Sequence, residues 1–97
     1  MYLKIHSTPK GEMVALCDAE LIGKTISEGA ITLDLSMHAA FYRGELVGEE
    51  AAVAALRAAA NANIVGKKSM AAAKKAGFSV SGAIKIAAVP HLQIYRI

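Results

Sequence analysis

An alanine-rich segment carries the longest helical pattern in the chain, and the rest of the sequence has to pack around it. Eight of the twelve residues from Ala51 to Ala62 are alanine, the residue with the highest helix propensity. Apolar residues recur there at three- and four-residue intervals, as along one face of a helix: Val53, Leu56, Ala60 and Ile64. The pattern predicts a main helix that ends near Asn63–Gly66. A second short helix is predicted to begin at Lys67–Ser69 and to end near Gly77.

Strand-like patterns lie on both sides of this helical region. Residues 2–6 alternate between polar and apolar, residues 7–11 have turn composition and residues 12–18 form a second apolar run, which together predict a β-hairpin. Further strands are predicted at Ile31–Leu35, around Ile84–Ile86 and at Leu92–Ile97, and Asp18 is expected to cap a helical turn over Ala19–Ile22. The order of elements predicts an α+β fold, a mixed or antiparallel sheet of about five strands with two helices packed on one face.

The length and composition predict one domain over residues 1–97. Many of the apolar residues are alanines and there are only five aromatic side chains, so the core is expected to be thin, which favours a homodimer interface. No apolar run reaches the roughly 20 residues that cross a bilayer. The first six residues alternate instead of forming a signal-peptide core. We therefore expect a cytoplasmic protein without a membrane partner.

Acidic and basic residues are unevenly distributed along the sequence. All eight acids lie at or before Glu50, together with four of the eleven bases, so this part has a formal charge of −4. The part after Glu50 has a charge of +7, from Arg57, Lys67, Lys68, Lys74, Lys75, Lys85 and Arg96. Such asymmetry predicts an anionic partner for the basic part. The alternative for any single lysine is a solvated helix face, and Lys74 and Lys75 also suit the C-terminal end of a helix.

The residues that commonly hold metals or act as nucleophiles are scattered. His6, His38 and His91 lack the short spacings of a metal site, and the single Cys17 has no second cysteine nearby, so we predict no metal, no disulfide and no cofactor. Cys17 lies in an apolar run and is expected to be buried and structural. The alternative is a small enzyme that uses Cys17, Asp18 and His91, which requires the three side chains to meet in one pocket.

The segment Gly66–Ser69 ends like a phosphate-binding loop, but Asn61 stands where that motif needs a glycine. A weaker prediction remains, in which free N–H groups at a helix start and the adjacent Lys67 and Lys68 bind one phosphate. Asn61 and Asn63 are expected to cap the break between the two helices.

The C-terminal strand presents a row of side chains suited to unpaired bases. On an extended strand His91, Gln93 and Tyr95 share one face, where they can stack on and hydrogen-bond bases; the alternative is a polar face of an edge strand. Pro90 is expected at a sheet edge, because it has no N–H to donate. Gly44 permits a tight turn that would present Tyr42 and Arg43 outward, so the working surface is predicted where these residues meet His91 and the Lys24 loop.

Five short segments resemble the small archaeal family called domain of unknown function 424. They are Met1–His6, Cys17–Lys24, Phe41–Gly44, Ala62–Gly66 and Val89–Ile94, and the likeness spans nearly the whole chain. The resemblance implies an archaeal, RNA-binding protein linked to translation and supplies no catalytic residue. Members commonly carry acids after the first helix, whereas this chain has none there. The matching positions that need no cap or core explanation are Lys24, Tyr42, Arg43, His91 and Gln93.

These observations together predict a non-enzymatic module that binds RNA or a ribonucleoprotein of the archaeal translation apparatus. The residues expected to contact RNA are Lys24, Tyr42, Arg43, Lys67, Lys68, Lys74, Lys75, His91, Gln93 and Tyr95. Besides the enzyme, the alternative is a protein–protein adaptor that adds its strand edge to a partner's sheet.

Overall fold

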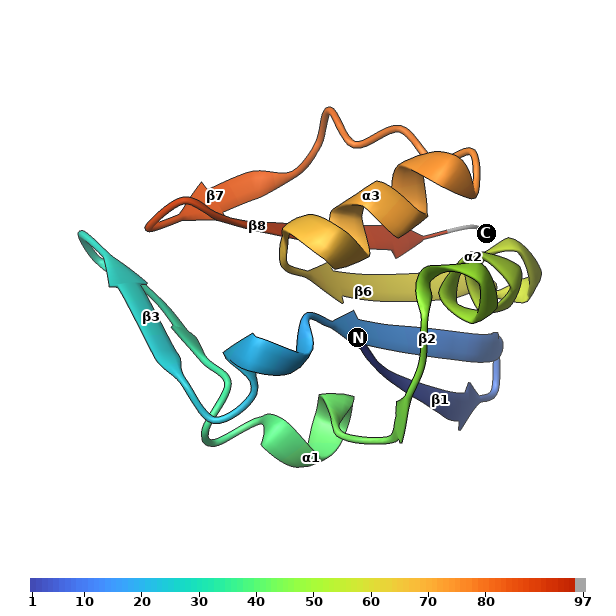
Figure 1. Ribbon diagram of the computed structural model, residues 1–97, viewed down its shortest axis with the longest axis horizontal. Coiled ribbons are helices and arrows are strands. Elements are labelled where there is room, and N and C mark those ends of the chain that lie inside the picture. Colours follow the sequence, from blue (N-terminus) through green and yellow to red (C-terminus); the bar gives the residue numbers. More distant parts are fainter. Residues whose placement is uncertain (96–97) are drawn as a thin grey trace.

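The structure is a computed structural model that describes residues 1–95 of the chain, so Arg96 and Ile97 at the end of the last predicted strand lie outside the described residues. A six-stranded sheet has the order β5 (Glu45–Leu46), β1 (Tyr2–Thr8), β2 (Gly11–Cys17), β6 (Asn61–Val65), β8 (Val89–Tyr95) and β7 (Ile84–Ile86). The β2–β6 pair is parallel and the other pairs are antiparallel, so the sheet is mixed. Strands β3 (Thr25–Glu28) and β4 (Ile31–Asp34) form a separate hairpin that projects from the sheet (Figure 1).

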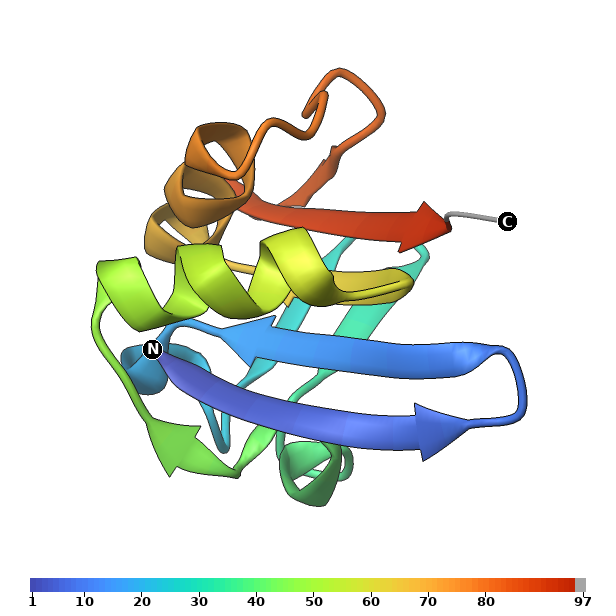
Figure 2. The same ribbon diagram turned by 90° about the vertical axis from the view of Figure 1, so that its right-hand side faces the viewer.

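Four helical segments complete the fold, and the two long ones share one face of the sheet. They are the 3-10 turn Ala19–Leu21, the short α1 (Ala39–Tyr42), α2 (Glu49–Ala58) and α3 (Lys67–Lys75). Figure 2 shows α2 and α3 on one side of the sheet and the β3–β4 hairpin on the other. The predicted α+β class and the placement of the two main helices are confirmed. No helix within residues 1–95 is long and apolar enough to span a membrane.

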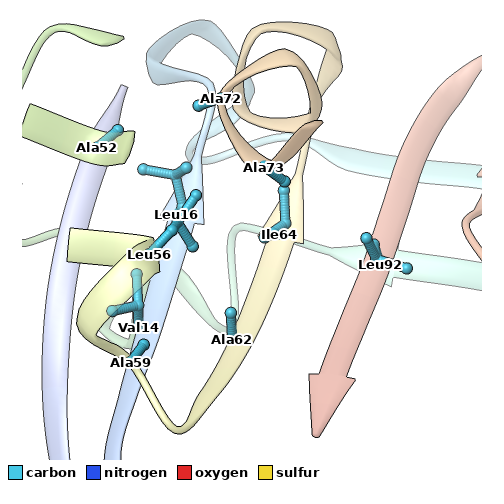
Figure 3. Close-up of a cluster of buried hydrophobic side chains, with 10 residues drawn as sticks. All are labelled: Val14, Leu16, Ala52, Leu56, Ala59, Ala62, Ile64, Ala72, Ala73 and Leu92. Carbon is cyan, nitrogen blue, oxygen red and sulfur yellow. The ribbon is translucent and has the colours of Figure 1, made fainter. Parts of the chain in front are cut away.

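Alternating side chains of the central strands supply two buried layers. Under α2 and α3, the fully buried Leu16 and Ile64 contact Leu56 and small residues such as Ala72 (Figure 3). On the opposite face, Cys17 and Val65 pack with Leu35 of the segment after β4 and Tyr42 of α1. The second face of the sheet is therefore also partly covered, by the hairpin and α1.

The predicted extent of the main helix is wrong at its C-terminal end. Helix α2 ends at Ala58, and the backbone at Ala59 is already extended. Asn61–Val65 then forms a central strand, in which Ile64 faces the helices and Asn63 faces the opposite side. Because Ile64 and Val65 are β-branched, they fit a strand better than a helix. The two asparagines therefore do not cap a break between helices, and the sheet has more strands than predicted.

Candidate functional site

The start of α3 is capped by a side chain from the distant end of β2. Asp18 Oδ1 accepts hydrogen bonds from the Ser69 amide at 2.8 Å and the Ser69 hydroxyl at 2.7 Å, and Oδ2 accepts one from the Lys68 amide at 3.1 Å. Gly66 has a φ of 108°, and a Cβ there would lie 2.2 Å from Asp18 Cγ, so only glycine admits the carboxylate. The predicted phosphate site is wrong at this point, because a buried carboxylate already occupies the amides. The sequence predicts that Asp18 caps the turn that follows it, but its side chain makes no capping hydrogen bond to the 3-10 turn.

The predicted lysines separate into two groups. Lys68 Nζ lies 3.8 Å from Glu20 Oε1, and Lys75 forms an ion pair with Glu49. Lys67 and Lys74, two turns apart on α3, instead line one groove together with Lys85 of β7. No carboxylate within residues 1–95 lies at salt-bridge distance from these three lysines.

The lysine groove, lined by Lys67, Lys74, Lys85 and intervening apolar side chains, has a volume of about 300 Å³. Met70 and Val80 are among those apolar residues, so the groove combines cationic and apolar side chains. Lys85 faces the helix side of the sheet because it is paired with Pro90, which also lines the groove. This arrangement can hold a polyanion through its charges and bury apolar parts of the ligand along the lysine stems.

A polar cluster lies on the opposite face of the sheet and is centred on Asn63. The Tyr42 hydroxyl donates to Asn63 Oδ1 at 2.7 Å, and His91 Nε2 lies 3.0 Å from the same oxygen. Tyr42 is only 4% exposed, so the prediction that it is presented outward is wrong. Gly44 allows the chain after α1 to pass close to Leu3 of β1, where a Cβ would meet the Leu3 carbonyl.

Burial disfavours the charged forms of three ionisable groups in this region, Cys17, Tyr42 and His91. It raises the pKa of Tyr42 well above its usual value, and it lowers the pKa of His91. The pKa of Cys17 is raised to about 12, mainly by burial and to a smaller extent by the nearby negative charges of Asp18 and Glu20. The thiolate that a cysteine nucleophile needs is therefore absent at neutral pH.

Cys17, Asp18 and His91 do not converge. Asp18 lines a cavity at the start of α3, whereas His91 lines cavities on the other face of the sheet, and Cys17 lines neither kind. Cys17 and His91 share a cross-strand row but are separated by Val65, a distance of roughly 10 Å at normal strand spacing. This geometry does not support the enzyme alternative. Within residues 1–95, no group of three potential metal ligands is close enough to hold an ion.

The predicted row on β8 has the expected orientation. His91, Gln93 and Tyr95 share the face that carries Asn63, and with Gly82 and Ile84 they line a hollow of about 320 Å³. Tyr95 is 65% exposed, and its hydroxyl donates to Gln93 Oε1 at 3.3 Å. The row and the lysine groove lie on opposite faces of the sheet, with the edge strand β7 beside both.

The prediction that Pro90 lies at a sheet edge is wrong, because β8 has β6 on one side and β7 on the other. Its carbonyl accepts from the Gly66 amide, just where β6 has ended. The ladder between β6 and β8 begins at the next pair, Val65 and His91, so the missing N–H of the proline leaves no gap in it.

Lys24 and Arg43 are exposed in loops next to the hairpin and α1. In the part of the chain that the structure describes, no side-chain hydrogen bond or ion pair joins either residue to the β8 row. Of the residues predicted to meet, only Tyr42 and His91 are connected, because both hydrogen-bond to Asn63 Oδ1.

Sequence reasoning missed two residues of these surfaces, Asn63 and Lys85. The two-residue alternation in Asn61–Val65 is the signal that could have placed Asn63 on a strand opposite Ile64. Lys85 stands between two isoleucines in a predicted strand, which turns it to the face opposite theirs. Its proximity to α3 depends on tertiary packing and has no local signal.

Comparisons with known proteins find relatives whose descriptions state no function. The family model described as "Protein of unknown function (DUF424)" matches residues 5–97. A crystal structure of an uncharacterized conserved protein from Methanopyrus kandleri is similar, with a TM-score of 0.81 and 26% sequence identity over 99% of this chain and 93% of that one. No curated protein matches the chain.

Proposed function

Because the chain belongs to the DUF424 family, whose description gives no activity, we propose its function from its surfaces: a non-enzymatic module that binds RNA or a ribonucleoprotein. The similar protein is archaeal, which agrees with an archaeal source. The further proposal of a role in translation, in the cytoplasm, rests on the family resemblance in the sequence alone. The observation that carries the proposal is the lysine groove.

The groove suits a nucleic-acid backbone for two reasons. Lys67, Lys74 and Lys85 have no carboxylate partner within residues 1–95, so binding a phosphate breaks no ion pair. Lys67 and Lys74 are about 10 Å apart along the helix axis, which spreads the charge along the groove instead of concentrating it at one anion. Lys68 and Lys75 face Glu20 and Glu49, whose charges oppose phosphate binding.

The β8 row supplies contacts of another kind. Tyr95 and Gln93 are exposed beside the half-buried His91, so a ring and an amide are accessible to unpaired bases. Strand β7 is the sheet edge between this row and the lysine groove. A single strand of RNA that passes around β7 reaches both surfaces.

The test measures the salt dependence of binding to a labelled single-stranded RNA by fluorescence anisotropy. Replacing Lys67, Lys74 and Lys85 together by Ala should lower the slope of log Kd against log salt by about 2, at roughly 0.7 for each phosphate that is no longer neutralised. The matched control replaces Lys10, Lys68 and Lys75 by Ala, which removes the same charge from outside the groove and should change the slope by less than about 1.

Equal effects of the two triple variants, or binding that does not respond to salt, would contradict the proposal. Heparin, tested under the same conditions, distinguishes binding of RNA from binding of any polyanion.

The preference for RNA over heparin should be lost when Gln93 and Tyr95 are replaced by Ala, because stacking contributes about 1–3 kcal/mol for each base. Both side chains are exposed, so thermal stability should be nearly unchanged.

A further inference from the structure

A row of four side chains crosses the face of the sheet opposite α2 and α3. Strands β1, β2, β6 and β8 each contribute one residue, because their pairing places these residues side by side and paired residues point to the same face. We call this set the strand-end row; it consists of His6, Met13, Asn61 and Tyr95. It shares Tyr95 with the β8 row and continues from there across three further strands.

The elements that cover this face of the sheet leave the strand-end row partly open. The β3–β4 hairpin lies beside β7 and the beginning of β8 (Figure 1), whereas Tyr95 is the last residue of β8. Tyr95 is exposed, and the other three side chains of the row are half-buried. Within residues 1–95, Met13 packs into neither of the two buried layers, so the cores do not account for its apolar side chain.

Aromatic rings stand at the two ends of the row. The imidazole of His6 is stacked on Phe41, with ring centroids 4.5 Å apart and planes inclined by 14°. His6 Nε2 lies 2.8 Å from the Phe41 carbonyl oxygen, which can only accept, so this nitrogen carries a hydrogen and the bond fixes the orientation of the ring. Tyr95 is three strands away, about 14 Å at normal strand spacing. Met13 lies between the rings, with a thioether that makes favourable contacts with aromatic groups.

The chemistry of the row suits bases and not phosphates. Its side chains are two rings, a thioether and an amide, without a lysine, an arginine or a carboxylate. The lysine groove, on the opposite face, has the complementary character, because its cations can bind the backbone. An RNA strand that passes around β7 reaches the strand-end row after the β8 row, since the two rows are continuous at Tyr95.

We propose that the strand-end row is a stacking surface for unpaired bases of a single-stranded RNA that runs across the strands from β8 to β1. One base stacks on the ring of Tyr95, another on the ring of His6, and a base between them contacts Met13. Because every base has a π face, such a surface tolerates different sequences. This inference rests on the proposed RNA binding and extends the base-contacting surface to β1, on residues separate from the lysine groove.

The methionines provide separate reporters for the two surfaces. The full chain, labelled at its methionine methyl groups, is titrated with a single-stranded RNA of about eight nucleotides and followed by NMR. The Met13 methyl signal should move upfield, because a base above it adds its ring current. The Met70 signal should also move, because Met70 lines the lysine groove. Met37 is the internal control: it is exposed in the turn between β4 and α1, lines neither surface, and should not respond.

Two further probes separate bases from phosphates. An abasic oligomer of the same length keeps the phosphates and lacks the bases, so it should move the Met70 signal and leave Met13 unchanged. A duplex of the same RNA should behave in the same way, because its bases are paired and stacked on one another.

Variants at the two ends of the row test the rings. Tyr95→Leu and His6→Leu should each weaken binding of the single-stranded RNA by about fivefold or more, measured by fluorescence anisotropy, whereas His6→Phe keeps a ring and should keep most of the affinity. Because Tyr95 is exposed, its variant remains folded even if His6→Leu disturbs the contact with α1. His38→Leu is the matched control, an exposed histidine outside the row, and should not change the affinity.

The outcomes distinguish this inference from the lysine-groove proposal. If Met70 moves with single-stranded RNA and Met13 does not, the strand-end row is excluded and the groove stands. An equal movement of Met13 with the abasic oligomer, or full RNA affinity in Tyr95→Leu and His6→Leu, would also overturn the inference. If Met13 moves but Met70 does not, only the groove proposal fails, and if neither signal moves, both fail.

Discussion

His91 connects the buried second layer to the exposed β8 row, and its ionisation should be visible in stability. Burial lowers the pKa of its imidazole in the folded state, so the unfolded chain binds a proton more readily. The free energy of unfolding should therefore be highest above about pH 6.5, the unfolded pKa, and should fall as the pH drops through the folded pKa. Urea denaturation between about pH 5 and 8 measures this, and His91→Gln should flatten the profile. A profile that is unchanged in the variant would rule out His91 as the source.

Asp18 is 3% exposed, and its carboxylate accepts hydrogen bonds from the backbone amides of Lys68 and Ser69 at the start of α3. Asp18→Ala removes that cap and leaves the buried Ser69 hydroxyl unpaired, so it should cost about 2–4 kcal/mol of unfolding free energy. Glu20→Ala is the control, because Glu20 is exposed and its contact with Lys68 is long; it should cost less than about 0.5 kcal/mol. Similar losses in the two variants, measured by urea denaturation, would refute the cap.

Cys17 is fully buried, and its raised pKa keeps it protonated. A thiol reagent at pH 8 should therefore react slowly with the folded chain and rapidly in denaturant. Cys17→Ala should leave RNA binding intact while lowering the free energy of unfolding by on the order of 1 kcal/mol. Rapid reaction of the folded protein would instead revive the enzyme alternative.

At the scale of elements, local pattern predicted the N-terminal hairpin and the two main helices, but it missed the central strand β6 and the short elements β3, α1 and β5. The N-terminal hairpin follows an alternating pattern, and the alanine-rich body of α2 follows a helical one. Ile64 fits a helical stripe and an alternating strand equally well, and the alanines before it favour the helix. Only the parallel pairing with β2 decides between them, and that pairing joins residues almost fifty positions apart. The polar cluster was missed for the same reason, since Asn63 reaches it from this strand.

The β7–β8 turn has a backbone that its residues do not favour. Ala87 and Ala88 have φ values of 48° and 69°, a conformation in which asparagine and glycine are preferred, and the Ala87 amide is held by Glu28 of the hairpin. Ala87→Asn with Ala88→Gly should raise the unfolding free energy by about 1–2 kcal/mol. Ala30→Gly is the control, since Ala30 lacks a positive φ, and it should give no gain. Thermal denaturation compares them, and an equal or lower melting temperature in the double variant would contradict the prediction.

At the scale of the whole molecule, charge along the sequence is a poor guide to charge on the surface. The acidic part of the chain folds against the basic part, so Glu20 and Glu49 meet Lys68 and Lys75. The spacing of Lys67 and Lys74 indicates a shared helix face, but the sequence does not show which lysine pair the acids contact. A phosphate-binding subset therefore becomes visible only when the tertiary structure is known.

The two buried layers share strands β2 and β6, because alternate residues of both strands point to opposite faces. If one layer unfolded, it would expose the two strands that also carry the other layer. The chain should therefore unfold in one step despite its thin core. Leu56→Ala in the helix layer and Leu35→Ala in the hairpin layer remove fully buried side chains, and each should cost about 2–5 kcal/mol.

Two signals report the layers separately. Far-UV circular dichroism follows α2 and α3, while near-UV circular dichroism follows Tyr42, the buried tyrosine of the second layer, since the chain has no tryptophan. In each variant the two signals should lose their native values at the same urea concentration, with an unchanged m value. If Leu35→Ala moved the near-UV transition and left the far-UV transition in place, the hairpin layer would unfold independently, and the polar cluster around Asn63 would open without loss of the helix layer.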